Sequence, residues 1–413
     1  MRLRIKFTEA IEELESSSAA GVVQSQSIPF YLGLLAAAAA AANIGLHWDI
    51  SWHRSIGRAE FWTPPHTMIF LCGALAATAC GYLIFAATYR RAAFPKGIAV
   101  RMGNFRGPIG AFLALWGICA MLTSAPFDNW WHITYGLDMK ILSIPHVLLI
   151  LGLLAIQTGG LIIVVAHVNR TENDSRKDPA PGLTPVSKRV SKDWIAIYFY
   201  FGSMILTLLM VTIAQYTTRS NMRDTLMYRI VAVLAPAIFA GIARALERNW
   251  AATFIAAGYS AFCLLMLWVL PLFPAAPAIG LVLTNVSHMI PLEFPLLLIV
   301  PAIAIDLLFL KIKHLNKFVL SIVTGVAFLC AFMFVQWEFA GFLQSPEARN
   351  WLFGAHYFDF STFPYSDYAQ HKFIGQGTLD PRFNFGVAIA LTCAILSAWV
   401  GLVWGDWMRR LRR

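Results

Sequence analysis

Charged residues are scarce in this chain of 413 residues. Asp, Glu, Lys and Arg make up 13% of it, whereas hydrophobic residues make up 58%. A soluble protein of this size cannot bury so much apolar surface, because a folded domain keeps much of its surface in water. Apolar runs of about 20 residues, long enough to cross a membrane as a helix, recur from residue 28 to residue 405. The composition therefore predicts an all-α polytopic integral membrane protein.

The sequence also lacks a cleavable signal peptide and a CxxC pair. Residues 1–27 carry mixed charge, and no small-residue cleavage site follows a short apolar core, so we expect a cytoplasmic N-terminal segment. All six cysteines lie within apolar runs, which favours small buried side chains over disulfides or a thiolate metal site. They are Cys72, Cys80, Cys119, Cys263, Cys330 and Cys393.

About ten transmembrane helices are predicted from the length of the apolar runs. A polar, proline-containing loop at 169–193 separates an N-terminal half, 28–168, from a C-terminal half, 194–413, whose longest outer loop is 343–381. The predicted spans are 28–47, 66–89, 108–128, 145–168, 194–217, 226–246, 250–273, 291–311, 317–342 and 382–405.

The net charge of +10 follows the predicted topology and does not indicate a nucleic-acid partner. Lys and Arg gather in alternate connections, which the positive-inside rule assigns to the cytoplasm together with both termini. We expect a protein of the inner membrane of a prokaryote, with the lipid bilayer as its surroundings. The basic clusters include Arg90, Arg91, Lys96, Arg170, Lys188, Arg189, Arg244, Arg248, Lys311, Lys313 and Arg409.

Most histidines fall on the opposite side of the predicted membrane. Eight of the ten lie at the outer ends of spans or in outer loops, although the topology was assigned from Lys and Arg alone. This asymmetry indicates that the chemistry of the protein lies near the outer membrane surface. The eight are His47, His53, His66, His132, His146, His288, His356 and His371.

One motif occurs twice at the outer ends of the first four predicted spans. In each copy an Asp-x-x-Trp-His sequence closes an outward-running span, and a Pro-His pair opens the returning one. The pattern predicts an internal repeat of two helical hairpins. The first copy comprises Asp49, Trp52, His53, Pro65 and His66, and the second comprises Asp128, Trp131, His132, Pro145 and His146.

The spacing within each copy brings together side chains that bind metals. Residues four apart share a helix face, so Asp49 and His53 can point to one place, and a proline in the first turn of the next helix returns His66 beside them. One carboxylate and two imidazoles leave coordination positions open. We therefore predict metal ligands at Asp49, His53, His66, Asp128, His132 and His146.

The residue types leave several alternatives open. The two copies could form two mononuclear sites or one dinuclear centre, and ligand type alone fits copper, non-haem iron or zinc. A hydrogen bond at a helix end, or a proton relay without metal, would use the same residues. His47 and Glu60 are candidates for further ligands or for groups that orient the ligands.

Residues 49–66, DISWHRSIGRAEFWTPPH, resemble the metal-site segment of the membrane C subunit of particulate methane monooxygenase and ammonia monooxygenase, the copper membrane monooxygenases. The resemblance implies copper bound by Asp49, His53 and His66 in a transmembrane site near the outer face. It departs from the family at Ala59, where the family has an acidic residue, and the second copy has Leu137 where the family has arginine. The matching positions are Asp49, Trp52, His53, Arg58, Thr63, Pro64 and His66.

We accordingly expect a copper-dependent, or non-haem iron, membrane monooxygenase that oxidises a small apolar substrate with O2. Trp52 and Trp131 would wall the sites. Arg58 and Glu60 are the predicted catalytic residues, and Arg58 would orient an acid or stabilise a reduced oxygen species. Such an enzyme needs an electron donor and could have companion subunits on the outer side. The alternatives are a membrane protein that handles or delivers copper, and an electron-transfer subunit that binds haem or quinone.

Two further outer segments carry polar side chains. His288 and Glu293 precede the span predicted at 291–311, which Pro291 and Pro295 would help to start. The loop 343–381 is aromatic and includes His356 and His371, which predicts a lid lying in the membrane interface.

Overall fold

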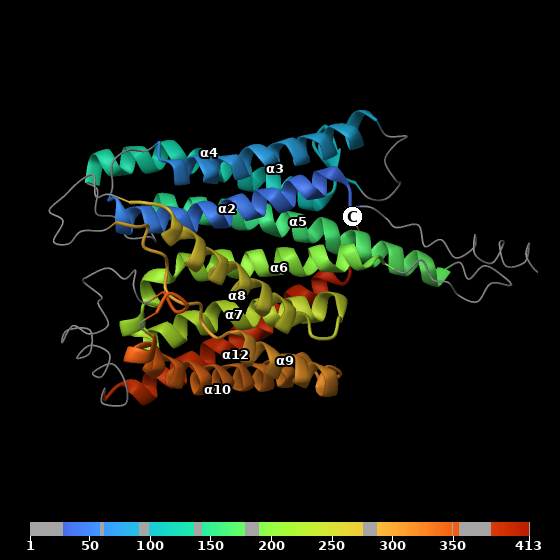
Figure 1. Ribbon diagram of the computed structural model, residues 1–413. Coiled ribbons are helices and arrows are strands. Elements are labelled where there is room, and N and C mark those ends of the chain that lie inside the picture. Colours follow the sequence, from blue (N-terminus) through green and yellow to red (C-terminus); the bar gives the residue numbers. More distant parts are fainter. Residues whose placement is uncertain are drawn as a thin grey trace, which may run out of the picture.

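The computed structural model describes residues 28–57, 62–90, 99–135, 143–177, 190–275, 287–348, 350–354 and 381–412. These residues form an all-α bundle of ten helices that run side by side (Figure 1). An antiparallel hairpin of β1 (Val100–Met102) and β2 (Phe105–Gly107) precedes α4. The helices are α2 (Phe30–Ser55), α3 (Pro64–Tyr89), α4 (Ile109–Tyr135), α5 (Ile144–Lys177), α6 (Lys192–Thr212), α7 (Thr225–Leu246), α8 (Ala251–Val269), α9 (Ile299–Ile312), α10 (Lys317–Leu343) and α12 (Phe383–Met408).

In this part of the chain nine helices are long and apolar enough to cross a membrane. The prediction of a polytopic integral membrane protein is therefore confirmed. The exception is α9, whose 14 residues extend about 21 Å at 1.5 Å per residue. The hydrocarbon core is about 30 Å thick, so this helix alone does not span it.

The span predicted at 291–311 is wrong over its first eight residues, because residues 287–298 are not helical. Pro291 and Pro295 lie within this extended segment and do not start the helix. Side chains from other helices accept hydrogen bonds from its backbone N–H groups. Ser55 accepts from Ile290 at 2.6 Å. Tyr259 accepts from Leu296 at 3.2 Å, and Gln336 accepts from Leu297 at 3.0 Å. Non-helical backbone is tolerated at membrane depth where protein groups satisfy it in this way.

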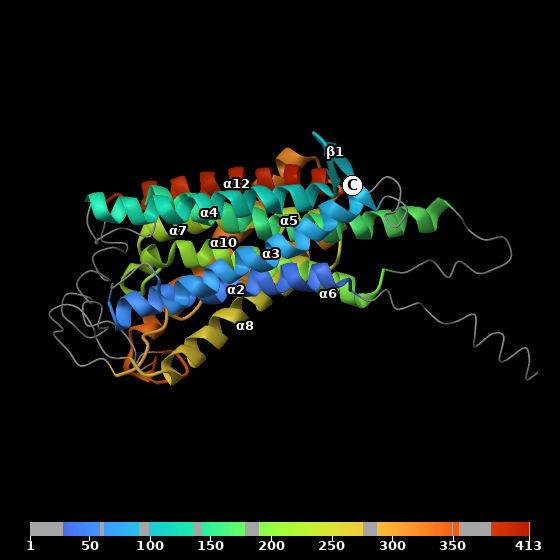
Figure 2. The same cartoon turned by 90° about the horizontal axis from the view of Figure 1, so that it is seen from above.

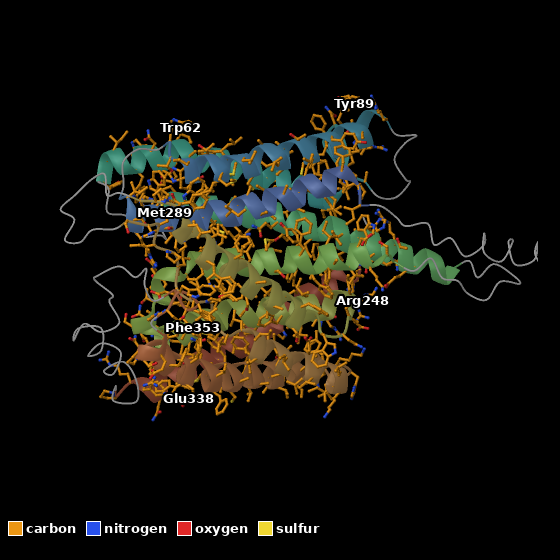
Figure 3. All side chains as sticks on the ribbon, in the orientation of Figure 1. Trp62, Tyr89, Arg248, Met289, Glu338 and Phe353 are labelled. Carbon is orange, nitrogen blue, oxygen red and sulfur yellow. The ribbon has the colours of Figure 1, made fainter. Side chains whose placement is uncertain are left out.

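The two ends of the bundle differ in composition. Trp62, Met289, Phe353 and Glu338 lie at one end, and Tyr89 and Arg248 lie at the other (Figure 3). The start of α2 and the end of α12 share the end marked by Arg248, and α5 projects beyond its neighbours there (Figure 1). We call this the basic end. The opposite end, where α2 and α4 finish and α3 and α5 begin, is called the histidine end.

Ion pairs join the helices at the basic end. Asp406 on α12 accepts from Arg244 on α7 at 2.7 Å and lies 3.2 Å from Lys317 Nζ at the start of α10. Glu247 lies 2.7 Å from Arg409, and Glu172 at the end of α5 pairs with Arg248. The basic residues at this end therefore connect α5, α7, α10 and α12.

Close helix contacts hold the hairpins together. A Cβ at Gly117 on α4 would lie 2.4 Å from the Gly152 carbonyl oxygen on α5, so both helices need glycine where they cross. Helix α6 of the C-terminal half contacts α8 and also α2 of the N-terminal half. Figure 2 shows that α8 is inclined to α2 and α6 and forms an edge of the bundle.

Candidate metal centre

The first hairpin brings Asp49, His53 and His66 together at the histidine end. Asp49 Oδ1 lies 3.3 Å from His66 Nε2 and 3.6 Å from His53 Nε2. Both distances exceed the usual 2.7–3.2 Å of an N–H···O hydrogen bond. Two ligand atoms about 2.0–2.1 Å from one tetrahedral metal ion are separated by roughly 3.3–3.4 Å. The spacing between the carboxylate and His66 therefore suits a shared ion as well as an ion pair.

The Asp49 carboxylate lacks a well-formed partner among the residues that the structure describes. Its Oδ1 atom is buried and accepts no hydrogen bond there, although two imidazole rings face it. The side chain as a whole is 19% exposed, but a carboxylate oxygen buried without a hydrogen bond is costly in a membrane protein. The oxygen therefore needs either a proton on an imidazole or a cation between the three side chains.

The start of α3 positions His66. Thr63 is the N-cap, with an extended backbone, and its Oγ1 accepts from the His66 backbone N–H at 3.4 Å. Pro64 and Pro65 occupy the first helical positions, where a missing N–H has no cost. Together the cap and the prolines fix His66 in the first turn of α3, beside the last turns of α2.

The second hairpin repeats this arrangement. Asp128 Oδ1 lies 3.2 Å from His146 Nε2, and the Asp128 residue is 8% exposed. Ser143 caps α5 as Thr63 caps α3, because its Oγ accepts from the His146 backbone N–H at 3.5 Å. The pairing of a cap with a histidine three residues later is a further shared feature, which the sequence comparison of the two copies had missed. His132 lies on α4, and its side chain is outside the described part of the structure.

The candidate ligands do not form a complete metal site in the residues described. Among these, no group of three or more His, Cys, Asp or Glu side chains is already arranged to hold a metal ion. His53, at 3.6 Å from Asp49 and with 39% of its side chain exposed, is the most loosely placed of the first trio. Arg58 and Glu60, the predicted catalytic residues, and His356 and His371 of the predicted lid, lie outside the described residues.

Two other side chains of α2 point elsewhere. His47 is buried against Phe262 and Cys263 of α8, away from Asp49 and α3. Trp52 packs with Trp48 against an apolar cluster on the α8 side, so its contacts do not support the prediction that it walls the Asp49 site. The cluster comprises Met266, Leu270, Ala275 and Met289.

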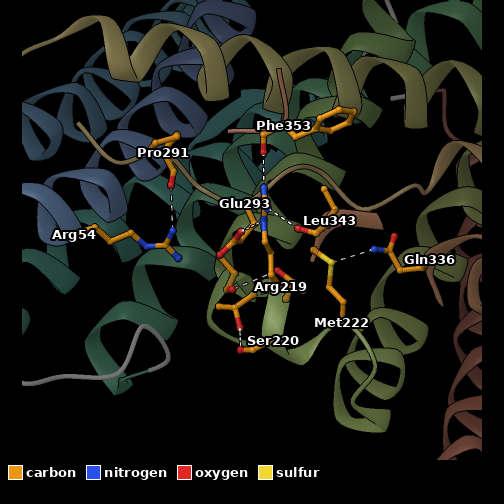
Figure 4. Close-up of polar contacts among 12 residues, drawn as sticks. Arg54, Arg219, Ser220, Met222, Pro291, Glu293, Gln336, Leu343 and Phe353 are labelled. Atoms are coloured by element: carbon orange, nitrogen blue, oxygen red, sulfur yellow. Dashed lines mark hydrogen bonds and ion pairs between the residues drawn. The ribbon is translucent and has the colours of Figure 1, made fainter. Parts of the chain in front are cut away.

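A buried ion pair fixes the extended segment 287–298 beside the end of α2 (Figure 4). Arg219 Nε lies 3.3 Å from Glu293 Oε2, and its other nitrogens donate to the carbonyls of Leu343 at 2.8 Å and Phe353 at 2.6 Å. Arg54, on the last turn of α2, donates to the Pro291 carbonyl at 3.1 Å. Burial raises the pKa of the Glu293 carboxyl, and the guanidinium groups of Arg219 and Arg54 partly offset that rise.

Glu293 therefore does not join the Asp49 trio in the structure. Glu293 pairs with Arg219, and His288 Nδ1 lies 2.7 Å from the hydroxyl of its neighbour Ser287. Arg219 is 2% exposed and contacts three separate segments at the histidine end. The residues that Arg219 contacts are far apart in the sequence, so the pattern of apolar runs could not predict its role.

Comparison of the chain with models of known protein families, with characterised proteins and with solved structures finds no match. The architecture and the geometry of the two hairpins are therefore the basis for any functional assignment.

Proposed function

We propose that this membrane protein is a metal-dependent oxidoreductase that uses copper to oxidise a small apolar substrate with O2. The metal would be held at the histidine end by Asp49, His53 and His66, and by Asp128, His132 and His146 in the second hairpin. The distribution of Lys and Arg, read by the positive-inside rule, supports a position of this end at the outer membrane surface. The short likeness of residues 49–66 to the copper membrane monooxygenases supports copper over iron.

One observation carries the proposal: both hairpins bring an Asp carboxylate and the imidazole of a Pro-His pair within 3.3 Å of each other at the same end of the bundle. A single Asp–His contact is common at helix ends. Here the same Asp–His pair occurs in two hairpins, and in each a Ser or Thr cap lies three residues before the histidine. The repeat favours a shared role for the two pairs. Aspartate and histidine are rare at such positions in membrane proteins unless they serve a function.

The carboxylates and the imidazoles would have different roles at the metal. The carboxylates supply negative charge that favours a cation, and the neutral imidazoles supply nitrogen ligands while leaving open positions for small molecules. Copper bound there would supply one-electron chemistry with dioxygen. The exposed apolar side chains of Trp62 and Trp130, near the two sites in sequence, give the histidine end a surface from which an apolar substrate could approach through the lipid.

Metal analysis of the purified protein in detergent tests the proposal. We expect bound copper in the wild type and its reduction in His66→Ala and His146→Ala. His288→Ala is the matched control, since His288 lies at the same end and its Nδ1 atom contacts the Ser287 hydroxyl. Equal copper content in His66→Ala, His146→Ala and wild type would contradict the metal assignment.

A second measurement separates an enzyme from a protein that handles metal. The copper-loaded protein, supplied with a chemical reductant, is expected to consume dioxygen faster than the His66→Ala variant. If the wild type binds copper in full but consumes dioxygen no faster than His66→Ala, the metal site is supported and the oxidoreductase activity is contradicted.

A further inference from the structure

A second set of potential metal ligands surrounds a pocket on the opposite side of α2. The pocket lies between α2, α6, α8 and the segment 287–298, and about 520 Å³ in and around it, including space open to solvent, is free of atoms. His47 of α2 and Cys263 of α8 both line it, and so do two methionines, Met210 of α6 and Met266 of α8. A thiol, an imidazole and two thioethers from three helices thus border one space.

The His47 ring is held in one tautomer. Its Nδ1 atom lies 2.8 Å from the backbone carbonyl of Asn43, and a carbonyl can only accept, so Nδ1 carries the proton. The Nε2 atom is therefore the unprotonated nitrogen of the neutral ring. Metal-binding histidines commonly have this arrangement, in which the second nitrogen donates to a backbone carbonyl.

The unprotonated nitrogen of His47 faces the sulfur of Cys263, whose thiol can donate to it. The two atoms are 3.8 Å apart, and His47 is 3% exposed. Nitrogen and sulfur ligands separated by an angle near 120° at one metal ion lie about 3.7 Å apart for bonds of roughly 2.0 and 2.3 Å. The Tyr259 hydroxyl also contacts this sulfur and accepts from the Leu296 backbone N–H, which fixes the pocket wall.

We propose that this pocket binds Cu(I), through Cys263 Sγ and His47 Nε2, with the thioethers of Met210 and Met266 beside them. Thiolate and thioether ligands select Cu(I), which is stable with few ligands. Binding forms a Cu–S bond in place of the S–H bond of Cys263, and the thiol proton leaves to the solvent. No electron is transferred in this step.

Charge balance favours a monovalent ion. Cu(I), one thiolate and one neutral imidazole form a complex of zero net charge, whereas a divalent ion with the same ligands would keep a positive charge. Glu293 also lines the pocket, but Arg219 already neutralises its carboxylate. Buried net charge is costly inside a membrane protein. The hard carboxylate of the Asp49 trio and the soft sulfur of this pocket are thus suited to different oxidation states of one metal.

The proposal does not depend on the oxidoreductase assignment, and the test keeps the two apart. Purified protein is titrated anaerobically with Cu(I) buffered by bicinchoninate, and the copper environment is examined by X-ray absorption. We expect copper–sulfur scattering in the wild type. In Cys263→Ser we expect that scattering to disappear and the number of bound Cu(I) ions to fall by one per chain. Cys80→Ser is the matched control, because Cys80 is also buried in a membrane helix but lies outside the pocket.

The double variant Asp49→Asn, Asp128→Asn distinguishes this pocket from the hairpin sites. We expect it to keep the copper–sulfur scattering even if it loses other copper. Sulfur scattering that persists unchanged in Cys263→Ser would overturn the proposal. So would a Cu(I)-loaded wild-type spectrum without any sulfur scattering, a result that needs no variant to fold.

Discussion

Gly45 on α2 lies so close to Ile69 on α3 that a Cβ at Gly45 would be 2.6 Å from Ile69 Cγ1 and 3.0 Å from the Ile69 backbone nitrogen. Gly45 is one helical turn before Asp49, and Ile69 follows His66 by nearly one turn. The missing side chain therefore sets how closely the carboxylate of α2 can approach the imidazole of α3.

Gly45→Ala is expected to separate α2 from α3. Overpacking of this kind costs about 1–3 kcal/mol, and the wider gap should weaken metal binding at the first hairpin. Thermal unfolding in detergent and copper content measure the two effects. Gly33→Ala on the same helix is the control, since nothing lies within 4 Å of a Cβ there. Equal losses in the two variants would show that the close approach at Gly45 has no special role.

Asp49→Asn and Asp128→Asn are expected to act independently. Each aspartate faces the Pro-His histidine of its own hairpin, so each substitution should remove the metal of one hairpin and leave the other. Metal analysis of the two single variants and the double variant tests this. If either single substitution empties both hairpins, the ligands share one dinuclear centre.

Arg219→Ala is expected to be among the most destabilising substitutions in the chain. It would leave the Glu293 carboxylate, 7% exposed, without its guanidinium partner. Removing one partner of a buried ion pair costs about 3–5 kcal/mol. In a double-mutant cycle with Glu293→Gln, the double variant should lose less stability than the two single variants added together.

The control for that cycle is Arg229→Ala. Arg229 donates to the Thr225 carbonyl of its own helix, so its loss should cost no more than about 1 kcal/mol. Additive effects of Arg219→Ala and Glu293→Gln would contradict a functional ion pair between them.

Asp306→Ala is expected to loosen α8 from α9. The Asp306 carboxylate of α9 accepts from the backbone N–H groups of Ala252 and Thr253 at 3.2 and 2.7 Å, and so caps a helix to which it does not belong. Loss of a cap costs about 1–2 kcal/mol, and here the contact between the two helices is lost as well. Thermal unfolding should place Asp306→Asn, which keeps one acceptor oxygen, between Asp306→Ala and wild type.

Asp224→Ala provides the comparison for this cap. Asp224 caps its own helix α7 at an exposed position, through Leu226 N–H at 2.9 Å. A loss as large as that of Asp306→Ala would mean that the contact between α8 and α9 adds nothing to the cap.

The helices could be predicted from the sequence because each apolar run had to satisfy its own backbone in lipid. That reasoning failed at 291–298, where the run continues but Tyr259 and Gln336 satisfy the backbone N–H groups of Leu296 and Leu297. Hydropathy records which residues avoid water. It does not record which side chain from a distant helix will accept a hydrogen bond.

The contacts of the candidate sites also differ in how far they could be predicted from the sequence. Asp49 and His66 could be paired from sequence because one short connection joins their helices and the motif recurs. His47 and Cys263 are separated by 216 positions, and Arg219 and Glu293 by 74, so only the packing of the bundle brings them together. Read alone, the cysteines predicted inert side chains, since no second cysteine stands near any of them at metal-binding spacing.

Each hairpin closes its own acid–imidazole pair within a short length of chain, and this has a consequence for biosynthesis. A nascent chain needs only two consecutive helices in the bilayer to bring the two side chains together, long before α12 is made. The C-terminal helices, with the segment that Arg219 anchors, can then assemble against hairpins in which each carboxylate already faces its imidazole.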